Sequence, residues 1–136
     1  FFVAERNCTN ASQILHQAEL SRAADKASVA YFTHSLAVAR WELEHFNELL
    51  NSTHGSSLKD QSVVWFYRFT TCARLARVCR EASDVEAYDK YLARALEFGR
   101  PFDANLKDAG TLFELVEKMD RHEKQQEGYP GTDTKP

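Results

Sequence analysis

The pattern of apolar positions is helical over most of the chain. From Ala27 to Leu50 no Gly or Pro occurs, so nothing in this stretch breaks a helix. Apolar residues recur there at alternating spacings of four and three, which places them on one helix face: Phe32, Leu36, Ala39, Leu43, Phe46 and Leu50. A second stripe lies on roughly the opposite side: Tyr31, His34, Val38, Trp41, His45 and Leu49. Because a helix that is apolar on two sides usually has neighbours on both, we expect residues 27–50 to form the central helix.

Turn signals and helix caps divide the rest of the chain into further helices. A first helix is expected over residues 10–24, and because no strong breaker follows, it could also continue into the central helix. A loop over residues 51–57 precedes a helix that ends near residue 81. The capping box Ser83-x-x-Glu86 then predicts a helix over residues 84–98, which Gly99 stops. A last helix ends near Glu127.

These elements predict an all-α protein, an antiparallel bundle of four to five helices. A single helical domain over residues 10–127 would lie between an irregular lead of residues 1–9 and a tail of residues 128–136. The 136 residues are enough to bury a core without metals or disulfides, and the small number of Gly and Pro favours helices. We expect the following residues to be largely buried: Phe32, Leu36, Leu43, Phe46, Trp65, Phe69, Leu92 and Leu112.

Residues 61–101 resemble one unit of the tetratricopeptide repeat family. The segment Tyr88-Asp-Lys-Tyr-Leu-Ala-Arg-Ala-Leu96 is similar to the second helix of such a unit, and Leu75-Ala76 is similar to the Leu-Gly pair of the first. The resemblance covers less than a third of the chain. It implies a helical hairpin over residues 61–101 within the bundle.

Charge and motifs exclude several classes of function. The net charge of −3 and the pI near 6.0 argue against a general nucleic-acid binder, which usually has a basic face. The sequence contains no phosphate-binding Gly-rich loop and no nucleophile elbow. Glu42-x-x-His45 occurs once, whereas di-iron bundles use two such motifs, so we expect no metal or other cofactor.

Cysteine and arginine positions raise two structural questions. Cys72 and Cys79 lie seven residues apart on one predicted helix, roughly 10.5 Å along its axis, so any disulfide would need Cys8. Both helical cysteines are better interpreted as small core residues. Arg68 falls inside the inward arc of its helix, and a buried arginine needs a carboxylate or several carbonyls. We predict a pair with Glu42, the alternative being a side chain that snorkels to the bundle edge.

The second stripe of residues 27–50 is the candidate binding surface. Tyr31, His34, Trp41 and His45 each combine an apolar body with a polar tip, and Trp and Tyr are enriched at binding hot spots. We expect these four residues to line a groove for a partner helix or for a second copy of the chain. The alternative is that the first or last helix covers them and satisfies their polar tips.

The sequence therefore favours a non-enzymatic helical domain that mediates protein–protein interaction. The alternatives are a ligand- or metal-binding helical bundle and a small enzyme whose site has no recognised motif. Phe1-Phe2-Val3 is either the stub of a removed signal or membrane anchor, or a short piece of core. The first interpretation favours an extracytoplasmic location over a cytoplasmic one, with membrane contact only through an upstream anchor.

Overall fold

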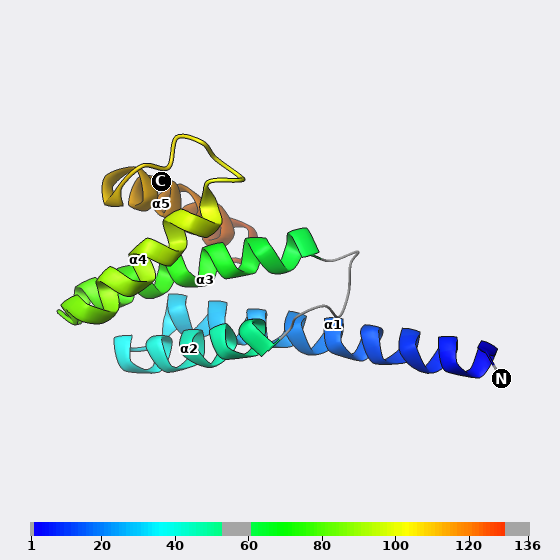
Figure 1. The fold of residues 1–136 in the computed structure, drawn as a ribbon. Helices are drawn as coiled ribbons and strands as arrows, with labels where there is room; N and C mark the ends of the chain where they lie inside the picture. The colour runs from blue at the N-terminus through cyan, green and yellow to red at the C-terminus, as the bar shows by residue number, and fades with distance from the viewer. Residues whose placement is uncertain (1, 53–60, 130–136) are drawn as a thin grey trace.

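The protein is built from helices alone in the part that the structure describes. The computed structural model describes residues 2–52 and 61–129, and the side chains of residues 16–52 and 62–129. The helices are α1 (Phe2–Thr33), α2 (Leu36–Ser52), α3 (Gln61–Glu81), α4 (Val85–Gly99) and α5 (Ala109–Glu127). The pairs α1–α2 and α3–α4 form antiparallel hairpins, and α5 packs on the second hairpin (Figure 1). The predicted all-α bundle is confirmed.

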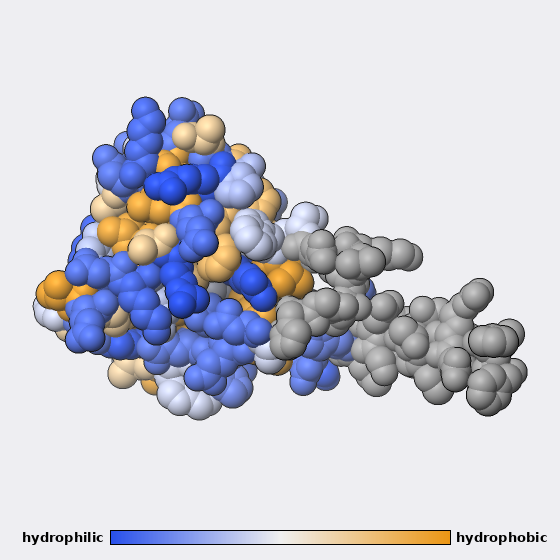
Figure 2. All heavy atoms as spheres, viewed as in Figure 1, coloured by the Kyte–Doolittle hydropathy of each residue, from blue (hydrophilic) through white to orange (hydrophobic). Residues whose placement is uncertain are grey.

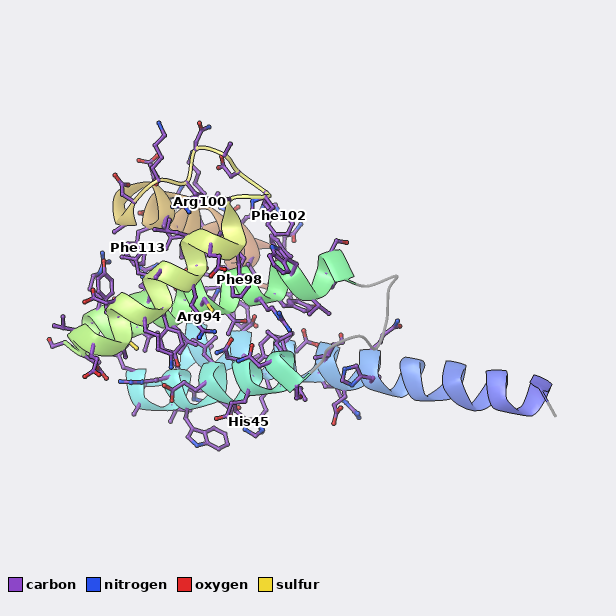
Figure 3. The ribbon with its side chains drawn as sticks, viewed as in Figure 1. His45, Arg94, Phe98, Arg100, Phe102 and Phe113 are labelled. Carbon is purple, nitrogen blue, oxygen red and sulfur yellow. The ribbon has the colours of Figure 1, made fainter. Side chains whose placement is uncertain are left out.

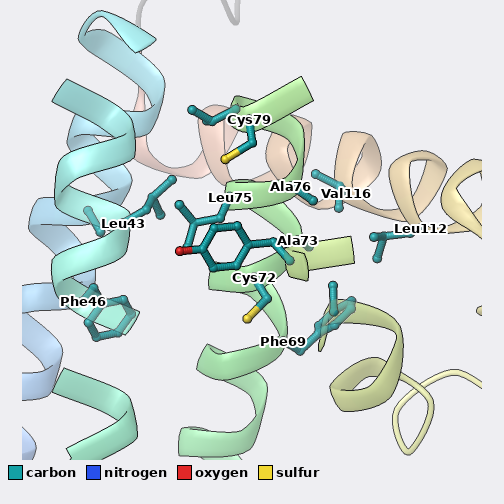
Figure 4. Packing of buried hydrophobic residues seen from close by; sticks show 14 of the residues in the cluster. Leu43, Phe46, Phe69, Cys72, Ala73, Leu75, Ala76, Cys79, Leu112 and Val116 are labelled. Atoms are coloured by element: carbon teal, nitrogen blue, oxygen red, sulfur yellow. The ribbon is translucent and has the colours of Figure 1, made fainter. Parts of the chain in front are cut away.

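The centre of the bundle is α3, and the prediction that residues 27–50 form the central helix is wrong. Helix α3 packs against α2, α4 and α5, and its buried side chains lie between those of α2 and α5 (Figure 4). Every residue from 71 to 76 is buried. Six consecutive residues turn through more than one and a half helical turns, so α3 is enclosed on all sides at this point. Its small residues Cys72, Ala73 and Ala76 let the neighbouring helices approach closely.

The predicted central helix is two helices separated by a sharp turn. Helix α1 continues through Asp25 and ends at Thr33, whose hydroxyl donates to the Val29 carbonyl over 2.6 Å. Ser35 then caps α2: its carbonyl accepts from the Ala39 amide at 2.9 Å, and its Oγ accepts from the Val38 amide at 3.4 Å. The sequence does indicate this turn, because Thr33, His34 and Ser35 are weak helix formers and serine is a favourable N-cap residue.

The beginning of α1 corrects a second prediction. An irregular lead was expected over residues 1–9, but α1 begins at Phe2. The first nine residues contain neither Gly nor Pro, so nothing in them interrupts a helix. Their side chains lie outside the described part of the structure, and so does the predicted role of Cys8.

The predicted core is confirmed at its centre and wrong at its edges. Leu43, Phe46, Phe69 and Leu112 are buried, and Phe32 and Leu92 are half-buried. Leu36 is 41% exposed because it opens α2 beside the turn, and Trp65 is 36% exposed near the start of α3. The Trp65 indole still has a fixed position, since its Nε1 donates to the Phe98 carbonyl over 2.9 Å.

Helix α4 begins at Val85, one residue later than the capping box predicts, because Asp84 and not Ser83 caps it. Ser83 has a left-handed backbone (φ 60°), and the amide of Asp84 donates to the Cys79 carbonyl at 2.9 Å, which closes the end of α3. Ser83 therefore terminates α3, and Asp84 caps α4 by accepting from the Ala87 amide at 3.2 Å. The Asp84 carboxylate also accepts from Arg40 Nη2 at 2.8 Å, so this turn is tied to α2.

Helices α4 and α5 end close to their predicted limits. Helix α4 ends at Gly99, and α5 ends at Glu127, followed by Gly128 in a left-handed conformation (φ 72°). Tyr129, assigned from the sequence to the tail, packs on Phe32 with 5.0 Å between ring centroids. The ordered bundle thus extends at least two residues beyond α5.

Candidate functional site

The four predicted partner-binding residues do not form one continuous surface. Because the helix breaks at His34 and Ser35, Tyr31 lies on α1 while Trp41 and His45 lie on α2. Tyr31 turns inward, and its hydroxyl donates to Asp120 Oδ2 on α5 at 2.5 Å. His34 is exposed in the turn, and only Trp41 and His45 remain neighbours on one helix.

Trp41 and His45 belong to an apolar strip on the outward side of α2. The Trp41 side chain is 59% exposed, and its ring stacks on that of His45, with 5.2 Å between centroids and 4° between planes. Val38, one turn earlier, is 43% exposed. His45 lies on the side of α2 that faces away from α3 and α4 (Figure 3). We call Val38, Trp41 and His45 the α2 outer face.

Arg68 does not form the predicted pair with Glu42. Its Nη2 donates to the Leu50 carbonyl at 3.0 Å, and its buried Nε has no hydrogen-bond partner within the described residues. Leu50 lies in the last turn of α2, where carbonyls have no partner within the helix, so Arg68 satisfies one of them. Glu42 instead pairs with Lys26 at 3.8 Å.

A second arginine of α3, Arg74, is buried. Its Nε donates to Asp120 Oδ1 at 3.2 Å, its Nη2 to Glu123 Oε1 at 2.7 Å and its Nη1 to Ser28 Oγ at 3.1 Å. One side chain on α3 therefore bonds both α1 and α5. Burial lowers the pKa of the Arg74 guanidinium, but the nearby carboxylates Asp120 and Glu123 more than offset this and keep it charged.

Asp120 is the acceptor that joins this network. Besides Arg74 and Tyr31 it accepts from Arg77 Nη1 at 3.3 Å, and its own side chain is buried. Burial, followed by the adjacent Asp120 carboxylate, raises the pKa of Tyr31 far above its ordinary range, so its phenol stays protonated. We call Tyr31, Arg74, Arg77, Asp120 and Glu123 the polar network, which crosslinks α1, α3 and α5.

A groove of about 630 Å³ lies beside the polar network, between α1, α3 and α5. Buried Leu43 and Phe46 line it together with the exposed carboxylates of Asp25 and Glu127. Burial, followed by the carboxylates of Asp25 and Glu123, raises the pKa of Tyr67. Burial, followed by the carboxylates of Glu123, Glu127 and Asp25, raises the pKa of Tyr129. We call this the α1–α5 groove; its lining includes Asp25, Val29, Phe66, Tyr67, Glu123 and Glu127.

The described residues contain no arrangement suited to a metal ion. No group of three or more His, Cys, Asp or Glu side chains comes together among them. Cys72 and Cys79 are free and buried, and burial, as the largest cause, raises the pKa of Cys72 to about 11. Both are therefore thiols at neutral pH, which agrees with their interpretation as small core residues.

Neither the hydropathy of the described helices nor comparison with other proteins places this chain in a protein family. Among the described helices, none combines the length and the apolar character needed to span a bilayer. On the face drawn in Figure 2, hydrophobic residues form separate areas among hydrophilic ones. Comparisons with protein-family models, curated proteins and solved structures found no match.

Proposed function

We propose that this chain is a non-enzymatic helical domain that binds another protein chain through the α2 outer face. The observation that carries the proposal is the 59% exposure of Trp41. An indole that leaves most of its surface in water loses the transfer free energy that its burial would supply. Trp is also the residue type most enriched at interaction hot spots, so a covering partner explains its position.

A second copy of the chain is the partner that this face fits best. Val38 and Trp41 are uncharged, so two identical faces can pack about these residues without bringing like charges together.

The α3–α4 hairpin supports the finer proposal that residues 61–101 act as a tetratricopeptide-like unit. The two helices run antiparallel and are joined by a short turn, and Leu75 and Ala76 are buried on α3. Ala95 and Gly99 are buried small residues of α4. In this proposal the hairpin is the rigid scaffold, and α2, packed against α3, presents the outer face.

Sedimentation equilibrium tests the proposal. The natural chain is expected to show a reversible monomer–dimer equilibrium, and Trp41→Ala is expected to remain monomeric at the same concentrations. Val85→Ala is the matched control, because Val85 is even more exposed but lies on α4. The proposal fails if the natural chain is monomeric at every concentration, or if Trp41→Ala dimerises as the natural chain does.

A further inference from the structure

We propose that the α1–α5 groove binds a basic amphipathic helix of another protein. This surface is separate from the α2 outer face, so the proposal does not depend on self-association.

The groove has the dimensions of a short helical segment. Its volume of about 630 Å³ falls within the range of binding pockets. Along α5 its wall extends from Met119 to Glu127, which is about 12 Å at the helical rise. Two turns of a helix have that length, and a groove between packed helices is a common site for a further amphipathic helix.

Exposed apolar side chains supply the contact surface within the groove. Val29 on α1 and Phe66 on α3 both line it and are both exposed, with buried Phe46 beneath them. The Phe66 ring is held in place by Phe102, at 5.5 Å between centroids. A preformed apolar surface of this kind favours a partner that brings aliphatic or aromatic side chains on one face.

The charges of the groove select a basic partner. Among the described residues that line it, Asp25, Glu123 and Glu127 are acidic, whereas the one arginine, Arg74, is already bonded to Asp120 and Glu123. Within the described residues, Asp25 and Glu127 have no cation within ion-pair distance. His122 also lines the groove, and it adds positive charge only when protonated.

Aromatic rings stand next to these carboxylates. Tyr67 and Tyr129 line the groove with Asp25, Glu123 and Glu127. A lysine or arginine side chain of the partner can therefore meet a carboxylate and the face of a ring at the same place. An acidic segment would meet the carboxylates of Asp25 and Glu127 there, and this like charge disfavours it.

Fluorescence anisotropy with three synthetic peptides tests the proposal on the full chain. The probe is a labelled amphipathic helix of roughly 14 residues, about four turns, with leucines on one face and lysines on the other. A second peptide has Glu in place of every Lys, and a third keeps the lysines but has Ser in place of every Leu. The probe is expected to bind saturably, and the other two peptides are expected not to.

Two sets of variants locate the binding site. Asp25→Asn combined with Glu127→Gln is expected to weaken probe binding roughly three- to tenfold, since each removes one partly screened charge. Glu97→Gln combined with Glu114→Gln removes two exposed carboxylates outside the groove and is expected to leave affinity unchanged. Val29→Arg is expected to abolish binding, whereas Val63→Arg, at an exposed position outside the groove, is not.

Several results would overturn the proposal. They are failure of the basic amphipathic probe to bind, equal binding of the lysine–serine peptide, or unchanged probe affinity in Val29→Arg. Circular dichroism of each variant shows whether the fold is retained. Because Asp25, Val29 and Glu127 make no contact in the polar network, their variants are expected to keep the helicity of the natural chain.

Discussion

At the scale of single residues, Arg68 and Arg74 show why helical periodicity misplaced the buried charge. Periodicity assigns an inward arc on the assumption that a helix has one buried side. Helix α3 is enclosed on all sides between residues 71 and 76, so Arg74 is buried (7% exposed) although it lies on a different side of the helix from Arg68. Arg68 lies six residues earlier and is only half-buried, where a single carbonyl of α2 is its partner.

The polar network predicts a large loss of stability when its central acceptor is neutralised. Asp120→Asn keeps the shape of the side chain but removes the charge that Arg74 and Arg77 share. Arg74 keeps Glu123 as a charged partner, so the loss is that of charge-assisted hydrogen bonds at a buried site, and we expect about 1.5–3 kcal/mol in the free energy of unfolding. Urea unfolding followed by circular dichroism measures it.

A neighbouring carboxylate on the same helix supplies the control for Asp120→Asn. Glu117 pairs with Arg121 at 3.3 Å on the exposed side of α5. Glu117→Gln is expected to cost less than about 0.5 kcal/mol, because exposed pairs contribute little. If Asp120→Asn is as mild as Glu117→Gln, the polar network does not hold the bundle together.

At the scale of helices, the sequence predicted most helix ends but missed the break between α1 and α2. Gly99 and the residues around Glu127 end α4 and α5 as predicted, because glycine and turn formers act locally. The turn at His34 and Ser35 was missed, because regular apolar spacing on both sides of it gave a stronger helical signal than two weak helix formers. The turn divides Tyr31 from Trp41, so the predicted binding stripe could not be continuous.

Two glycines are expected to respond to alanine with opposite signs. A Cβ at Gly99 would lie 2.5 Å from Phe69 Cε1 and 2.6 Å from Leu106 Cδ1, so Gly99→Ala forces the core apart. We expect it to cost about 1–3 kcal/mol in the free energy of unfolding, as overpacking does. A Cβ at Gly110, in the first turn of α5, would meet only Asp108 Oδ1 at 3.5 Å.

Gly110→Ala should therefore stabilise the protein by about 0.5 kcal/mol through the higher helix propensity of alanine. Thermal unfolding of the two variants under identical conditions measures both effects. Equal shifts in the same direction would show that the close approach of Gly99 to Phe69 does not exist in solution.

At the scale of the whole molecule, the sequence predicted the fold class and much of the core, but not the arrangement. Leu43, Phe46 and Phe69 were identified as core because their own helices place them inward. Which helix is central depends on contacts between segments far apart in the chain, and periodicity within one helix does not contain that information. The polar network and the α1–α5 groove are missed for the same reason, since each combines residues from α1, α3 and α5.

The central claim is that Trp41 serves a partner and not the fold, and the stability of the isolated monomer tests it most directly. At a protein concentration low enough to exclude association, urea unfolding of Trp41→Ala should match the natural chain within about 0.5 kcal/mol. Leu43→Ala, two residues later but buried, should lose about 2–5 kcal/mol. A Trp41→Ala monomer that is destabilised as strongly as Leu43→Ala would contradict the account, because the indole would then belong to the core.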